Sequence, residues 1–132
     1  MPAIVLLAHG SPDPAWIRPI ERTAARLREL APERRVAVAT LDEAEAIQRK
    51  LLALNVERYG ERDVRVVAYF MSPGGRHLRR DIPALVAVAQ ETHPEATITL
   101  IPGALGVADE VVDALARAAL RLGGGDLPEE SA

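Results

Sequence analysis

Cysteine is absent from this 132-residue chain, and its absence excludes several kinds of site. Disulfides, thiolate-bound zinc, iron–sulfur clusters and a cysteine nucleophile all need sulfur that the sequence does not supply. A site for a borderline metal must therefore use imidazole, and the chain has 3 histidines.

Aromatic residues are scarce, at 3% of the chain, and basic residues do not exceed acidic ones. The 16 Lys and Arg residues against 19 Asp and Glu residues give a formal net charge of −3, which argues against a nucleic-acid binder held by a general basic field. Few rings are available to stack on bases. The core must therefore be built from Ala, Val, Leu and Ile.

Long hydrophobic runs are also missing. The apolar run from Ala3 to Ala8 is far shorter than the roughly 20 residues that span a bilayer, and no basic stretch with an apolar segment behind it opens the chain. We expect a cytoplasmic protein without membrane or nucleic-acid partners. The length predicts a single domain, over residues 1–122, followed by a flexible tail at 123–132.

Short aliphatic or β-branched runs alternate with longer stretches of helical periodicity, an order typical of βαβ units. The predicted strands are Ala3 to Ala8, Val36 to Thr40, Val64 to Phe70 and Thr97 to Ile101. The predicted helices are Pro14 to Leu30, Glu43 to Arg58, Ile82 to Glu91 and Ala108 to Leu122. The expected fold is α/β, with a four-stranded parallel sheet and helices on both faces.

The first strand is apolar throughout, as a strand covered on both faces should be, and is expected at the centre of the sheet. Asp13 and Pro14 fit the N-cap and first position of the helix that follows. Its predicted buried stripe is Ile17, Ile20, Ala24, Leu27 and Leu30.

Two of the histidines follow predicted strands. His9 comes directly after the first strand, and His77 lies in the predicted loop after the third. Right-handed crossovers place both loops at the carboxyl edge of the sheet, where open α/β folds bind ligands. Neutral imidazole there can bind a metal or accept a proton near neutral pH. His93 belongs to the opposite edge and is expected to be a surface residue.

The neighbours of these histidines suit a ligand with oxygen groups, although each also has an ordinary structural reading. Glycine lets the backbone approach a ligand, at Gly10, Gly74 and Gly75. Three cations that could receive a phosphate or a polycarboxylate, or could simply be solvated, are Arg76, Arg79 and Arg80.

Other polar residues near the two loops fit helix caps. Ser11 is expected to cap, or else to donate to a substrate oxygen. Asp42 precedes Glu45 at capping-box spacing, and Asp81 before Ile82 also reads as a cap. Asp42 nevertheless falls at the same edge as the two histidines, so it could add a carboxylate to the cluster or take up protons.

Together these motifs resemble the sirohydrochlorin chelatase family, in its small, single-domain class of tetrapyrrole metal chelatases. The resemblance rests on Leu7 to Ser11, on Leu41-Asp42 with Ala44-Glu45, and on Gly75-Arg76-His77 with Asp81-Ile82-Pro83; it extends through Leu105-Gly106-Val107 and the last helix. It implies a chelatase-like fold, a flavodoxin-like half of the two-domain enzymes. The family commonly has Glu where this chain has Asp42 and Pro where it has Ala46.

The resemblance implies that the protein inserts Co²⁺ or Fe²⁺ into sirohydrochlorin, in cobalamin or siroheme biosynthesis. His9 and His77 would bind the ion and accept pyrrole protons, with help from Asp42. The divalent ion, for which Ni²⁺ is also suitable, is a substrate, and no tightly bound cofactor is expected. Because the domain is half of a two-domain chelatase, the resemblance also implies a homodimer.

Two alternatives stay open. Histidine phosphatases also place His-Gly after their first strand, but they have Arg before that histidine, where this chain has Ala8. A non-catalytic module that binds metal or tetrapyrrole would use the same histidines, and would bind without inserting the ion.

Overall fold

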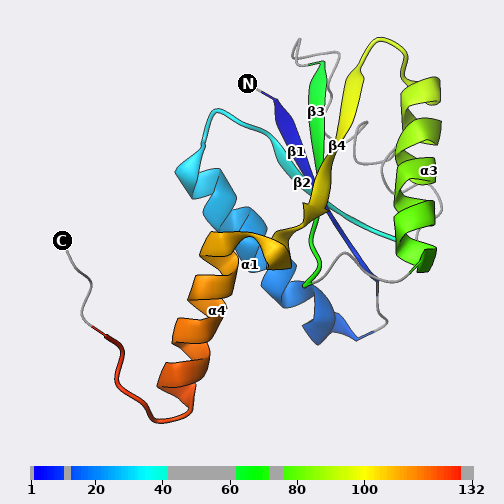
Figure 1. The fold of residues 1–132 in the computed structure, drawn as a ribbon. Coiled ribbons are helices and arrows are strands. Elements are labelled where there is room, and N and C mark those ends of the chain that lie inside the picture. Colours follow the sequence, from blue (N-terminus) through cyan, green and yellow to red (C-terminus); the bar gives the residue numbers. More distant parts are fainter. Residues whose placement is uncertain (1, 11–12, 42–61, 72–75, 129–132) are drawn as a thin grey trace.

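The computed structural model describes residues 2–10, 13–41, 62–71 and 76–128, with the backbone alone for 76–79 (Figure 1). Its four strands are β1 (Ala3–Ala8), β2 (Val36–Thr40), β3 (Asp63–Ala68) and β4 (Thr97–Ala104). They form one parallel sheet in the order β2-β1-β3-β4, which confirms the predicted α/β fold and the central place of β1.

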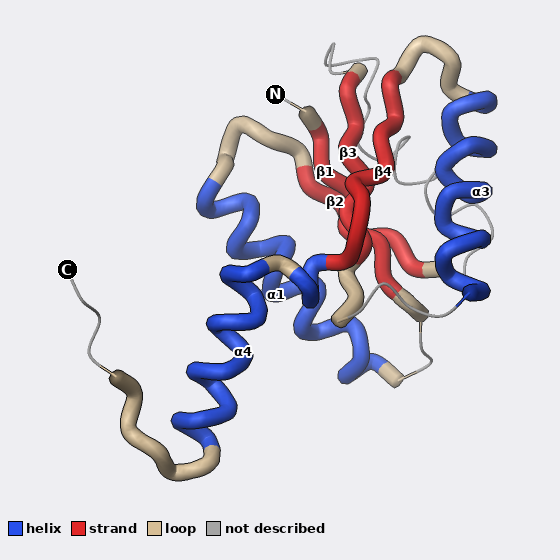
Figure 2. Tube along the Cα trace, in the orientation of Figure 1, coloured by secondary structure: helices blue, strands red, loops and turns tan. Residues whose placement is uncertain are grey.

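The described helices are α1 (Pro14–Leu30), α3 (Arg76–Thr92), the short 3-10 turn η1 (Leu105–Val107) and α4 (Asp109–Leu122). Figure 2 shows α3 on one side of the sheet, with α1 and α4 on the other. None of them is long and apolar enough to cross a membrane, within the described part of the chain. The predicted helix at 43–58 lies outside the described residues.

Strand β1 is buried along its whole length because both of its faces are covered. Its even-numbered residues pack with Ile20 and Ala24 of α1. Its odd-numbered residues pack with the side of the sheet that α3 covers, where Ile82 and Val86 are buried. Alternating strand side chains point to opposite faces, so one continuous apolar run serves two cores.

Helix α1 begins and ends where its sequence predicts. The Asp13 carboxylate accepts a hydrogen bond from the Ala15 N–H at 2.9 Å, which confirms the predicted N-cap. The buried stripe is shorter than expected, because Leu30, the last residue of the helix, is 66% exposed.

Helix α3 begins at Arg76, so the predicted start at Ile82 is wrong. Asp81 is an interior helix residue rather than a cap, and Arg76, His77, Arg79 and Arg80 belong to the helix rather than to a loop. The error came from reading Asp81 as an N-cap, since aspartate favours that position. Pro83 is an exposed residue in the interior of this helix.

The junction between α3 and β4 is held by one side chain. The Gln90 amide donates to the carbonyls of His93 and Ala96, at 3.1 and 2.7 Å, and its oxygen accepts from the Ile98 N–H at 2.8 Å. These three bonds fix the start of β4, which runs to Ala104 rather than to the predicted Ile101. Strand β3 conversely ends at Ala68, two residues before the predicted Phe70.

Helix α4 differs from the other helices in having no buried residue. It projects away from the sheet, and contacts chiefly η1 (Figure 1). Its apolar residues, predicted as a helical stripe, therefore stay open: Val112 is 52% exposed and Leu122 is 77% exposed.

Gly106 gives a test of the packing between η1 and the end of β3. Its N–H donates to the Phe70 carbonyl at 2.8 Å, and a Cβ on this buried residue would overlap the Met71 backbone. We expect Gly106→Ala to lower the free energy of unfolding in urea by at least about 2 kcal/mol, because backbone must move. Gly123→Ala is the control for a smaller change, since its Cβ would lie 3.2 Å from the Ala119 carbonyl oxygen and would need a shift of only a few tenths of an ångström. An equal loss in both variants would contradict this account.

Candidate active site

His9 is the predicted site residue that the structure places most clearly. It follows the last residue of β1, and its side chain is exposed at the carboxyl edge of the sheet. The His9 imidazole packs edge-to-face against the Phe70 ring, with 5.0 Å between the ring centroids and 67° between the ring planes. The His9 carbonyl accepts a hydrogen bond from the Trp16 indole N–H at 2.9 Å.

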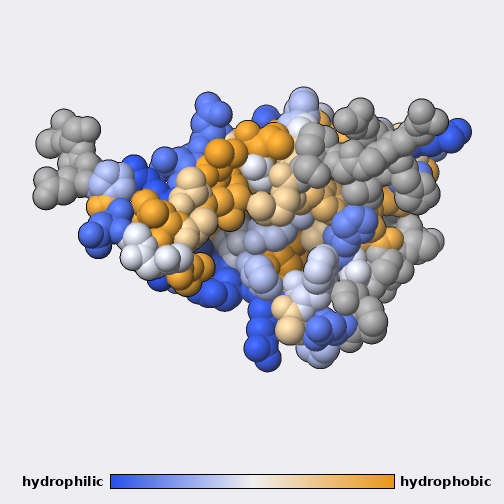
Figure 3. All heavy atoms as spheres, turned by 60° about the horizontal axis from the view of Figure 1, so that its bottom comes forward, coloured by the Kyte–Doolittle hydropathy of each residue, from blue (hydrophilic) through white to orange (hydrophobic). Residues whose placement is uncertain are grey.

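His9 borders an apolar cavity of about 690 Å³. The walls come from the ends of β1 and β3, the first turns of α1, η1 and the start of α4. Figure 3 shows apolar side chains gathered along α4 and around this hollowed face. The lining residues include Ala8, Trp16, Ile20, Tyr69, Phe70, Met71, Leu105, Val111 and Leu115.

A pair of hydroxyl groups joins two walls of the cavity. Thr23 Oγ1 donates to the Pro19 carbonyl at 2.8 Å and lies 3.0 Å from the Tyr69 hydroxyl. A hydroxyl has only one hydrogen, so Tyr69 must be the donor in the second bond. This bond ties α1 to the segment after β3 and fixes the Tyr69 ring in the wall.

The other predicted histidine lies on the helix that leaves β3. His77 is the second residue of α3, whose amino end lies toward the carboxyl edge of the sheet (Figure 1). Arg80 follows on the same helix and is exposed. Since α3 has 17 residues, its first turn also carries the positive end of a helix dipole.

The structure leaves several predicted site residues untested. Gly10 is half-buried beside His9. Ser11, Asp42, Gly74 and Gly75 lie outside the described residues, and the side chains of His77, Arg76 and Arg79 are not described. Within the described side chains, no group of three His, Asp or Glu residues is placed to hold a metal ion.

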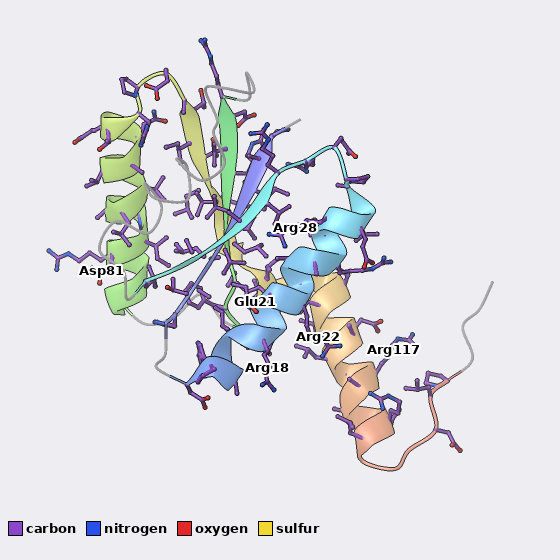
Figure 4. The ribbon with its side chains drawn as sticks, turned by 180° about the vertical axis from the view of Figure 1, so that it is seen from behind. Arg18, Glu21, Arg22, Arg28, Asp81 and Arg117 are labelled. Carbon is purple, nitrogen blue, oxygen red and sulfur yellow. The ribbon has the colours of Figure 1, made fainter. Side chains whose placement is uncertain are left out.

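Three further groups of titratable residues lie away from the cavity. Figure 4 shows Asp81 on α3, across the sheet from α1 and α4, whose residues line the cavity. At the amino edge, Asp63 raises the pKa of Arg65 by a hydrogen bond and by its charge. His93 also lies at that edge, as predicted, but it is not the expected surface residue: its side chain is only 17% exposed and its Nδ1 lies 3.4 Å from a Glu95 oxygen.

Comparison with known proteins assigns the family. Residues 3–122 match the family model described as CbiX. The chain belongs to the CbiX family. This confirms the resemblance to sirohydrochlorin chelatases, and it indicates a metal chelatase of cobalamin biosynthesis.

A solved structure agrees with this assignment. This chain is similar in fold to a cobalamin (vitamin B12) biosynthesis CbiX protein from Marinobacter aquaeolei VT8. The TM-score is 0.78 and the sequence identity is 28%. The match covers 92% of this chain and 97% of the other. A search of curated proteins found no match.

Sequence reasoning did not find every wall of the cavity. It identified His9 from its position directly after a buried strand. It missed Thr23, Val111 and Leu115, since ordinary helical periodicity accounts for each of them. Their role depends on how α4 leaves the sheet, which periodicity does not specify.

The bond between Thr23 and Tyr69 gives a quantitative test of the cavity wall. We expect Tyr69→Phe and Thr23→Val each to lower the free energy of unfolding, and the double variant to lose less than the sum. A double-mutant cycle in urea should return a coupling of about 1 kcal/mol, as for a hydrogen bond between neutral groups. Additive losses would show that the two hydroxyls do not interact.

Proposed function

We propose that this protein is a cytoplasmic chelatase that inserts Co²⁺ or Fe²⁺ into sirohydrochlorin. The observation that carries the proposal is His9, exposed at the border of an apolar cavity of about 690 Å³ in a CbiX family chain. Small-molecule sites are commonly of 300–1,000 Å³, lined by apolar groups with a few polar ones. A flat macrocycle with carboxylates at its periphery needs this combination of surfaces.

The reaction exchanges two protons for one metal ion. Two pyrrole N–H bonds break, both protons leave to bases, and the freed nitrogens bind the ion. His9 is placed to act as such a base, because a neutral imidazole accepts a proton near neutral pH. We propose that His77 and His9 bind the incoming ion, and that Asp42 accepts a further proton or orients a ligand.

Imidazole suits this task because it binds the relevant ions without holding them as a thiolate would. Co²⁺, Fe²⁺ and Ni²⁺ all accept imidazole ligands, and cellular availability then helps to decide which ion is used. The choice between the cobalamin and siroheme routes follows from that ion. The family match supports the cobalamin route.

The substrate carboxylates need cations at the same edge of the sheet. Arg76, Arg79 and Arg80 lie in the first turns of α3, where the helix dipole also favours negative charge. We therefore propose that these arginines bind the peripheral carboxylates of the substrate. Backbone at Gly10, Gly74 and Gly75, with the Ser11 hydroxyl, would complete the contacts.

Insertion can be followed by anaerobic absorbance with sirohydrochlorin and Co²⁺. We expect the wild-type chain to accelerate the reaction over the uncatalysed rate, and His9→Ala and His77→Ala each to reduce it at least about 100-fold, as for loss of a general base. His93→Ala, at the opposite edge, should keep wild-type activity. Parallel runs with Fe²⁺ and Ni²⁺ rank the metals.

The same assay separates the alternatives. A spectrum that shifts on binding without faster insertion would identify a carrier of tetrapyrrole or metal. Turnover of a phosphomonoester without added metal, abolished in His9→Ala, would instead support a histidine phosphatase. Full activity in both folded histidine variants would overturn the chelatase mechanism.

We also propose that the protein works as a homodimer in which α4 of each copy packs on the other. The chain carries both halves of such a contact: the exposed apolar residues of α4 and an apolar groove of about 750 Å³ between α1 and the sheet. Arg22 and Arg26 line that groove, whereas Asp109 and Glu110 open α4. Both surfaces are therefore apolar, and the arginines of the groove are opposite in charge to the carboxylates of α4.

Light scattering tests this arrangement. We expect a dimer for the wild-type chain, and a shift of at least tenfold toward monomer for Val112→Asp, because a buried unpaired carboxylate costs several kcal/mol. Ala114→Asp puts the same charge elsewhere on α4, at an exposed residue, and should remain dimeric. A wild-type chain that stays monomeric at working concentration would contradict the proposal.

A further inference from the structure

We infer that Trp16 is a positioning residue for His9. The inference rests on the proposed function and adds a residue that acts on the reaction through the backbone. Its indole N–H donates to the His9 carbonyl at 2.9 Å, which ties the first turn of α1 to the residue directly after β1.

Both ends of this hydrogen bond are fixed by other contacts. The Trp16 end lies in a helical turn that Asp13 caps, since the Asp13 carboxylate accepts from Ala15 and its carbonyl accepts from the Trp16 N–H at 3.0 Å. The His9 end follows Ala8, whose carbonyl accepts from the Leu41 N–H at 2.9 Å. The indole bond therefore connects two rigid elements.

The bond holds the His9 carbonyl, where the backbone is no longer restrained by the sheet. Residue 9 has left the strand ladder, and its side chain is exposed. With its carbonyl held by Trp16 and its ring against Phe70, the imidazole is restrained from both backbone and side chain. A base that must meet a pyrrole proton gains rate from such fixed placement.

Burial does not account for Trp16. Its side chain is 57% exposed, so the largest ring in the chain contributes little to either apolar core. The one donor of its side chain bonds the backbone of a candidate catalytic residue, which points to a role at the site instead. Either its N–H positions His9, as we infer, or its ring face serves as a surface for the ligand.

An isosteric replacement separates these two roles. Trp16 is the only tryptophan in the chain, so residue-specific labelling exchanges this ring alone. In 3-benzothienylalanine a sulfur replaces the indole N–H and the ring shape is nearly kept. Incorporation of 5-fluorotryptophan, which retains the N–H, is the matched control, and circular dichroism checks that both proteins fold.

We expect the sulfur analogue to lower the insertion rate at saturating sirohydrochlorin about five- to tenfold, the loss expected for one hydrogen bond. The half-saturating tetrapyrrole concentration should change less than twofold, and the fluorinated protein should match wild type in both quantities. In the free protein, the His9 imidazole signals in a ¹H–¹³C NMR spectrum should shift or broaden with the sulfur analogue only.

The outcomes separate this inference from the proposed function. Unchanged His9 signals with an unchanged rate would overturn the inference and leave the retained ring face as the surface for the ligand. A raised half-saturating concentration at an unchanged rate would also overturn it, because the N–H would then act in binding the tetrapyrrole. A third outcome is that the sulfur analogue perturbs the His9 signals while the wild-type protein inserts no metal. That combination would support the positioning of His9 by Trp16 and contradict the chelatase proposal.

Discussion

Burial of β1 on both faces is the constraint on which the rest of the structure depends. A strand of Ala, Ile, Val and Leu needs cover on both sides, which this parallel sheet supplies: β2 and β3 flank it, and α1 and α3 cover its two faces. The strand then ends at a fixed point, and the next residue is His9. The precision of the site therefore comes from packing, since apolar contacts hold the backbone from which the imidazole extends.

The site gathers chemistry at one edge because parallel strands all deliver their following segments there. His9, Phe70 and the amino end of α3 meet at this edge, while His93 and the Asp63–Arg65 pair lie at the other. An apolar cavity beside a few polar groups matches the needs of a flat macrocycle with charged substituents. The open face of α4 adds a surface that a second copy can cover, which would extend the cavity wall beyond a single chain.

Much of this arrangement could be predicted from the sequence, for identifiable physical reasons. Continuous apolar character gave the bounds and central place of β1, and the Asp13-Pro14 pair gave the start of α1. The predicted start of α3 was wrong because Asp81 reads as an N-cap, whereas it lies inside a helix that begins at Arg76. The direction of α4 was not predictable, since an amphipathic stripe shows that a face will be covered but not by which surface.

The candidate site divides in the same way. His9 was predicted from its position after a buried strand, but its bond partner Trp16 was not, because seven residues separate them and α1 must first turn back. The roles of His77 and Asp42 stay predictions.

Paramagnetic NMR with Co²⁺ tests the central claim most directly, since it requires neither tetrapyrrole nor turnover. The account predicts that substoichiometric Co²⁺ broadens the signals of His9, Phe70 and Met71 at the carboxyl edge of the sheet and leaves those of His93 and Glu95 sharp. Broadening confined to His93 and Glu95, with the His9 signals unchanged, would contradict the assignment of this edge to the metal ion.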